Sequence, residues 1–262
     1  MLRQRVITAL ALVAVLLPIL FWLPPVFATA TFTVIAALAA WEWSRMTLPS
    51  APSHFLFPAF IVLCCGGCLI LTDWQINFCL AASAWWLYVP LWLLRGGRLR
   101  DSVSGLVAGV VLIVPTFVAM LRLHARDPWV LLAAMALIWV ADISAYFAGR
   151  RFGHHKLAAT ISPGKTWEGA AGALAGCLVY VSLLQKFVYP QLPSNLALLY
   201  AGTAILVAIS IVGDLFESMI KRQAGVKDSS QLLPGHGGVL DRIDSLTSTL
   251  PMMVAMSTVF PR

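Results

Sequence analysis

Charge is scarce in this sequence. Only 11% of its 262 residues are charged, whereas 60% are hydrophobic. This balance excludes an ordinary soluble globular domain and favours a protein that crosses a membrane. Low-complexity linkers and internal repeats are also missing, so we expect one all-α integral-membrane domain over residues 1–262.

The cysteines lack the pattern of a metal or disulfide framework. All five lie in or near apolar runs, and the single C-x-x-C, Cys65 and Cys68, has no second pair and no histidine at ligand spacing. A zinc or redox role is therefore not expected. The net charge of +7 could indicate a nucleic-acid partner in a soluble protein. In an apolar chain it is better explained by basic loops that orient the spans, so no nucleic acid is expected.

Apolar runs predict nine membrane-spanning helices, each long enough or nearly long enough to cross a bilayer. Their expected ranges are Val6–Leu23, Val26–Trp43, Phe55–Leu71, Ile76–Leu94, Ser104–Leu121, Trp129–Ala148, Gly169–Val188, Leu196–Leu215 and Ile243–Phe260.

The basic residues predict the orientation of these spans. With the N-terminus inside, the outer loops hold only Arg122, Arg126, Lys186 and Arg262, which leaves 14 of the 18 basic residues inside. This bias follows the positive-inside rule. The first span could also be a signal peptide, but its length and the span that follows at once favour a retained helix.

Small residues mark two expected packing faces. Gly105 and Gly109 form one G-x-x-x-G pattern, and Gly172 and Gly176 form another. Close helix–helix packing is the usual role of this pattern.

The stretch from Asp214 to Asp244 departs from the rest of the chain. It holds five of the eleven carboxylates, together with four basic residues and one histidine, His236, in a glycine-rich turn. Charge near a bilayer is costly unless it is paired, hydrated or metal-bound, so this stretch is the candidate functional site.

The acids in this stretch have helical spacing. If the eighth helix continues to about Arg222, Asp214, Glu217 and Lys221 share one face, and Asp241 and Asp244 share a face where the ninth helix begins. Several carboxylates brought together repel one another unless a cation lies among them. Oxygen ligands beside phosphate favour Mg²⁺.

Two other segments on the same predicted side carry polar groups. Asp142, at the end of the sixth span, is either paired with Arg150 or Arg151 or forms a wall of the site. The run I-S-P-G-K-T-W-E-G, residues 161–169, lacks the first glycine of a P-loop because Ala159 stands there. Its turn with Lys165 is either an anion seat or a simple helix cap by Thr166.

The run S-M-I-K-R-Q-A-G-V-K-D-S-S-Q-L-L-P-G-H-G-G-V-L-D-R-I-D, from Ser218 to Asp244, is similar to the signature of the phosphatidate cytidylyltransferases, also called CDP-diacylglycerol synthases. Every fixed position of that signature is met without a gap. The segments D-I-S-A-Y-F-A-G-R-R-F-G and S-P-G-K-T-W-E-G also resemble elements of the family, so the similarity covers at least Asp142 to Asp244.

The resemblance implies condensation of CTP with phosphatidate to give CDP-diacylglycerol and pyrophosphate, with Mg²⁺ as cofactor. It implies catalytic roles for Asp214, Asp241, Asp244 and Lys227, with the three aspartates as metal ligands. Substrate contacts are expected from Ser162, Lys165, Ser218, Lys221, Arg222, His236, Gly237, Gly238 and Arg242. We expect a multi-pass protein of the bacterial inner membrane with its site facing the cytoplasm, membrane lipid around it, and a homodimer as one option for its assembly.

Two other functions stay open at this point. A CTP-dependent polyprenol or phytol kinase shares the style of bundle but transfers the γ-phosphoryl group. An ion-coupled transporter would use intramembrane carboxylates, although the acids here cluster at one edge instead of the midplane.

Overall fold

The computed structural model describes residues 2–48, 52–99, 101–189 and 195–259. Phe260 and Arg262, which the sequence analysis names, lie outside this part of the chain, as does Arg100, one of the 14 basic residues predicted to lie inside. The described residues form the α-helices α1 Leu2–Phe21, α2 Pro25–Thr47, α3 Ser53–Ile70, α4 Gln75–Leu94, α5 Ser102–Arg126, α6 Pro128–Phe152, α7 Trp167–Phe187, α8 Leu196–Gln223 and α9 Leu240–Val259, with a short 3₁₀ helix, η1 Thr72–Trp74, and the strands β1 Lys156–Ala158 and β2 Ser162–Thr166.

The predicted class, an all-α membrane protein, is confirmed in its main feature. Each expected span lies within or largely overlaps one helix, and seven helices in the described ranges are long and apolar enough to cross a membrane. They are α2, α3, α4 with η1, α5, α6, α7 and α8.

Polar residues set the helix ends. Asp101 caps α5 by accepting the Ser104 amide at 2.7 Å, and the Ser104 side chain completes a capping box. At the end of α8, Gly225 has a φ of +71°, and the Val226 amide donates to the Lys221 carbonyl at 2.9 Å. This arrangement is a Schellman motif, which stops α8 and turns the chain into the loop before α9.

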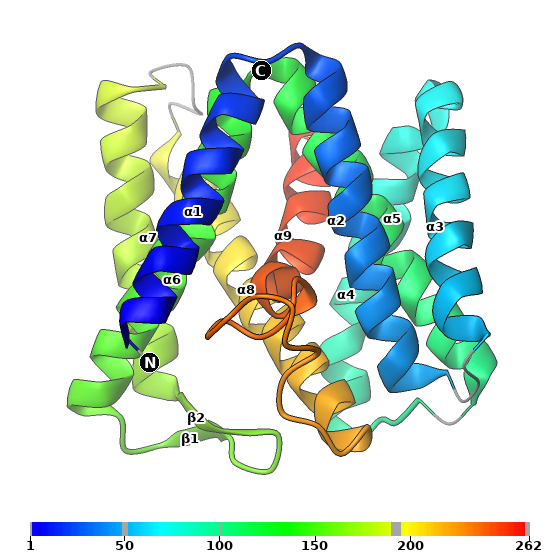
Figure 1. Cartoon of the computed structure of the whole chain (residues 1–262). Coiled ribbons are helices and arrows are strands. Elements are labelled where there is room, and N and C mark those ends of the chain that lie inside the picture. The colour runs from blue at the N-terminus through cyan, green and yellow to red at the C-terminus, as the bar shows by residue number, and fades with distance from the viewer. Residues whose placement is uncertain (1, 49–51, 100, 190–194, 260–262) are drawn as a thin grey trace.

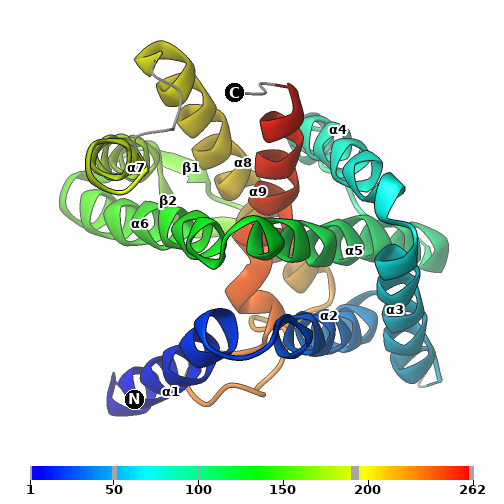
Figure 2. The ribbon, with the colours of Figure 1, turned by 90° about the horizontal axis from the view of Figure 1, so that it is seen from above.

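Helix α9 lies in the middle of the bundle, beside α4, α5 and α8 (Figure 2). Four of its hydroxyl residues, Ser245, Thr247, Ser248 and Thr249, are buried, and Ser245 and Ser248 donate to carbonyls of α8. Ser248 donates to the Ile209 carbonyl at 2.9 Å, and the Trp86 indole donates to the Thr247 carbonyl at 3.0 Å. A helix enclosed by protein can satisfy such groups without lipid contact, which accounts for its low apolarity.

A two-stranded hairpin joins α6 to α7, and the sequence analysis did not predict its strands. β1 and β2 pair antiparallel, with Lys156 opposite Thr166 and Ala158 opposite Ser162. Thr166 also caps α7, because its hydroxyl accepts the Gly169 amide at 3.1 Å. The hairpin lies at the same end of the bundle as the start of α1 and the loop between α8 and α9 (Figure 1).

Both G-x-x-x-G patterns lie at close helix contacts, as predicted. A Cβ at Gly109 of α5 would lie 2.5 Å from the Trp43 indole nitrogen of α2 and 2.7 Å from the Phe57 ring of α3. A Cβ at Gly176 of α7 would collide with the Ser144 hydroxyl of α6. These glycines let the helix backbones approach one another.

The Gly109 contact can be tested with one methyl group. Gly109→Ala should lower the unfolding free energy by roughly 1–3 kcal/mol, because the indole and phenyl rings must move. Gly66→Ala on α3 is the matched control, since a Cβ at Gly66 would have no atom within 4 Å. Thermal unfolding in detergent measures both variants, and equal stability of the two would contradict the packing described.

Candidate functional site

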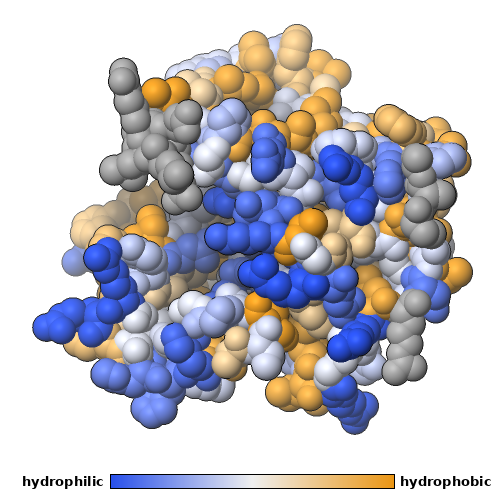
Figure 3. Space-filling view, turned by 60° about the horizontal axis from the view of Figure 1, so that its bottom comes forward, coloured by the Kyte–Doolittle hydropathy of each residue, from blue (hydrophilic) through white to orange (hydrophobic). Residues whose placement is uncertain are grey.

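The site is built where the end of α8 meets the start of α9. Hydrophilic side chains gather over much of this end of the molecule (Figure 3). Because α8 runs to Gln223, Asp214, Glu217 and Lys221 follow one another along a single helix face, as the sequence predicted.

Lys221 lies between two buried acids. Its ammonium is 2.6 Å from Oδ1 of Asp241 and 3.1 Å from Oε1 of Glu217, and the Glu217 side chain is only 1% exposed. Apart from this ion pair, the Glu217 oxygens have no hydrogen-bond partner among the described residues. One cation therefore faces two carboxyl groups in a region with little water, where a net negative charge would be costly.

The hairpin brings Lys165 into the site. Its ammonium is 2.6 Å from Oδ2 of Asp214, and the Ser218 hydroxyl donates to Oδ1 of Asp214 at 3.1 Å. The structure thus joins Lys165, Asp214 and Ser218, which the sequence separates by about fifty residues. Ser162 lies on the same strand, half-buried and opposite Ala158.

Further carboxylates lie around this ion pair. Asp142 of α6 and Asp244 of α9 are both within electrostatic range of Asp214, and Lys165 and Arg242 act on Asp142. Arg150 and Arg151 both lie in the described part of the chain, and neither forms an ion pair with Asp142. Asp142 is therefore placed as a wall of the site instead of a partner of those arginines.

A magnesium ion would need carboxylate oxygens, usually from one or two acids, together with phosphate and water oxygens. Oδ2 of Asp214 is paired with Lys165 and its Oδ1 accepts from the Ser218 hydroxyl, so a metal there would have to replace one of these partners. Oδ1 of Asp244 accepts from the Ser245 amide. The described residues contain no cluster of three or more His, Cys, Asp or Glu side chains that could hold a metal.

Asp241 has a different environment from the one expected for a metal ligand. Oδ1 is bound by Lys221, and Oδ2 accepts the Ser229 amide at 2.9 Å, the Ser229 hydroxyl at 2.9 Å and the Gly238 amide at 2.8 Å. A metal at Asp241 would have to replace several of these donors. In the structure this side chain holds the loop before α9.

Glu42 belongs to the site region although the sequence analysis did not single it out. It lies near the end of α2, is 0% exposed, and accepts hydrogen bonds from the loop between α8 and α9. A carboxylate inside a predicted apolar span was the available signal, because such a residue needs partners. Ser229 and Ser230, which donate to it, were also missed.

Three of the remaining predicted residues, Arg222, Lys227 and Arg242, are exposed. Lys227 and Arg242 form no ion pair within the described ranges, and Arg222 donates to the Val226 carbonyl at 3.4 Å. The Nδ1 atom of His236 is buried without a hydrogen-bond partner among the described residues. Gly237, with a φ of +81°, and Gly238 pass close to the carboxylates of Asp241 and Glu42.

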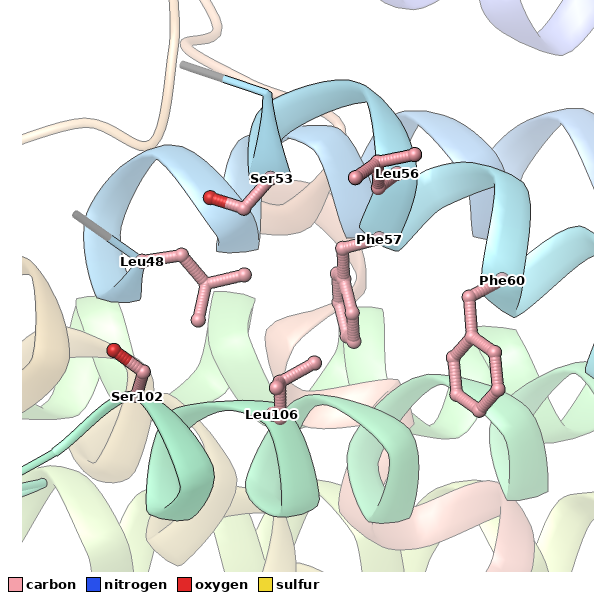
Figure 4. A pocket seen from close by; sticks show the side chains of 7 residues that line it. All are labelled: Leu48, Ser53, Leu56, Phe57, Phe60, Ser102 and Leu106. Carbon is pink, nitrogen blue, oxygen red and sulfur yellow. The ribbon is translucent and has the colours of Figure 1, made fainter. Parts of the chain in front are cut away.

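A separate apolar pocket lies beside α3 and α5 (Figure 4). It has a volume of about 320 Å³ and its lining consists of Leu48, Ser53, Leu56, Phe57, Phe60, Ser102 and Leu106. This lining offers no charge to bind phosphate, so the pocket is distinct from the charged site.

Apolar helices with a charged group at one end define a multi-pass membrane protein. The model of the cytidylyltransferase family matches residues 3–260, and the chain belongs to this family. It is 38% identical over 267 residues to a phosphatidate cytidylyltransferase of Pseudomonas aeruginosa, covering 98% of this chain and 97% of that protein. Relatives with the same name are 35% identical in Haemophilus influenzae, over 96% of both chains, and 35% identical in Brucella abortus, over 99% of this chain and 94% of the other.

Because Lys221 is the one cation between Glu217 and Asp241, we expect a strong effect when its charge is removed. Lys221→Met should lower the unfolding free energy by roughly 3–5 kcal/mol, since it leaves Glu217 and Asp241 facing each other without a counter-charge. Adding Glu217→Gln should restore part of the loss. The control is Lys186→Met, whose ammonium lies over the Phe187 ring at the surface. Thermal unfolding that shows equal losses for Lys186→Met and Lys221→Met would disprove the assignment.

Proposed function

We propose that this protein transfers the cytidylyl group of CTP to phosphatidate and so forms CDP-diacylglycerol and pyrophosphate. The observation that carries the proposal is the family match over residues 3–260, in a chain whose acids and bases meet at one end of an apolar bundle. Relatives named phosphatidate cytidylyltransferase, which this chain matches over nearly full length, support the choice of substrates.

The reaction needs charge neutralisation more than proton transfer. A phosphate oxygen of phosphatidate attacks the α-phosphorus of CTP, the bond from that phosphorus to the bridging oxygen breaks, and pyrophosphate leaves. The lipid phosphate is already anionic at neutral pH, so no general base is required. Positioned cations stabilise the charge that develops on the oxygens.

The basic residues divide into two groups by environment. Lys227, Arg222 and Arg242 are exposed, so their charges are available to the phosphates of CTP and phosphatidate. Lys165 and Lys221 are already paired with acids, and their pairing orients those acids. Ser162 and Ser218 are the neutral groups for substrate contact, and His236, whose Nδ1 is buried, shapes the turn with Gly237 and Gly238.

Magnesium is the proposed cofactor. Asp214 and Asp244 would hold it, with Asp241 supporting the loop beside them. When bound, the ion supplies positive charge to the phosphate oxygens. The chain's own residues align the two substrates and limit access of water to them.

The proposed setting is the bacterial inner membrane, with nine spans, the N-terminus in the cytoplasm and the site facing the cytoplasm. The distribution of basic residues supports this orientation, and α1 begins at the same end of the bundle as the site (Figure 1). CTP would then reach the site from water and phosphatidate from the bilayer.

Product analysis tests the reaction directly. Purified protein given phosphatidate and CTP labelled in the cytidine should place that label in the lipid, and CTP labelled at the γ-phosphate should not. The reverse pattern would indicate a lipid kinase. Absence of any transfer, combined with ion flux in vesicles, would indicate a transporter.

The metal proposal is tested at Asp214. Asp214→Asn should reduce CDP-lipid formation at least about 100-fold at low Mg²⁺, because a carboxylate ligand becomes a weaker neutral one. Asp73→Asn, in η1 at the other end of the bundle, is the matched control and should keep wild-type turnover. An Asp214→Asn enzyme with the wild-type dependence on Mg²⁺ would remove this residue from the metal site.

A further inference from the structure

Glu42 is a buried acid whose four hydrogen bonds all come from one distant loop. Its Oε2 accepts from the Leu240 amide at 2.7 Å and the Ser229 hydroxyl at 2.9 Å. Its Oε1 accepts from the Ser230 hydroxyl at 2.6 Å and the Val239 amide at 2.9 Å. Burying a carboxylate costs several kcal/mol unless such donors surround it, so the match is specific.

These donors lie at both ends of one loop. Ser229 and Ser230 lead into the segment 231–238, and Val239 and Leu240 lead out of it. These two ends lie close together and form the neck of the loop. Asp241 reinforces this neck by accepting hydrogen bonds from the Ser229 and Gly238 amides. Two carboxylates, one from α2 and one from α9, therefore close the base of the loop.

Glu42 also acts as a helix cap supplied from another helix. Leu240 is the first residue of α9, and its amide and that of Val239 are the kind of unpaired donors found at a helix start. A negative charge there is further favoured by the helix dipole. Glu42 thus fixes the loop and the direction in which α9 begins.

The neck leaves no space for a side chain at position 238. A Cβ on Gly238 would collide with the Ser229 hydroxyl and with both oxygens of Glu42. The glycine pair before α9 is therefore explained by the approach of Glu42 and Asp241. His236 lies within the closed loop, and Lys227 lies two residues before its neck.

We propose that Glu42 is a positioning residue that holds loop 229–240 in the shape that binds CTP. It acts through the loop and does not touch substrate. Its kinetic consequence rests on the proposed cytidylyltransferase function, whereas its effect on the loop itself does not.

The test compares full-length protein with Glu42→Gln in detergent. The amide has one acceptor oxygen instead of two, and its NH₂ group would face the Leu240 amide or the serine hydroxyls. Hydrogen–deuterium exchange of residues 229–240 should become faster without ligand. The apparent KM for CTP should rise about 10-fold if one loop in ten remains competent, while kcat changes little.

Two further variants keep the test decisive. Ser230→Ala removes a single donor and should raise the KM for CTP about 5-fold, as expected for the loss of one hydrogen bond. Gln75→Leu is the matched control. Gln75 is the first residue of α4, and its side chain donates a buried hydrogen bond to the Cys68 carbonyl of α3, which the variant removes. It should lower stability without changing loop exchange or KM.

The outcomes separate the proposals. Wild-type loop exchange and KM in Glu42→Gln would overturn the positioning role, and so would fast exchange with an unchanged KM or a loss confined to kcat. If Glu42→Gln does not fold, Ser230→Ala decides by the same two measurements. If the wild-type protein forms no CDP-lipid, the proposed function fails, and loop exchange still tests the anchoring by Glu42.

Discussion

The ion pair between Lys221 and Asp241 joins the two helices on which the site depends. At 2.6 Å it ties the last turn of α8 to the first turn of α9, and Glu217 completes the group one helical turn away. In an apolar bundle these groups are stable only together, because each one alone would be a buried unpaired charge. This junction fixes where the loop between the helices begins and ends.

The helices could be predicted well because apolarity and length mark them directly. The extension of α8 to Gln223 was also foreseeable, since Asp214, Glu217 and Lys221 repeat at helical spacing. The hairpin was not, because Ser162–Thr166 contains proline and glycine and lacks the alternating pattern of a strand. Its position is set by the contact of Lys165 with Asp214, which no local pattern contains.

The structure gathers several of the predicted site residues at one end of the bundle, and their roles in binding and catalysis stay predictions. The sequence places Asp241 and Asp244 on one helix face, yet Asp241 points its oxygens at Lys221, Ser229 and Gly238. Which donors each acid meets depends on tertiary contacts. Glu42 escaped notice for the same reason, because its partners lie 187 to 198 residues further along the chain.

That separation has a consequence for how the protein is made. The first two helices leave the ribosome well before the segment that they support, and Thr8 of α1 also contacts that segment by donating to the Pro234 carbonyl at 3.0 Å. Helices α1 and α2 thus supply contacts that residues 229–240 can make only once the last part of the chain has been synthesised. The loop of residues 229–240 can be held at both ends only after α9 has entered the centre of the bundle, so an incompletely synthesised chain would lack this loop conformation.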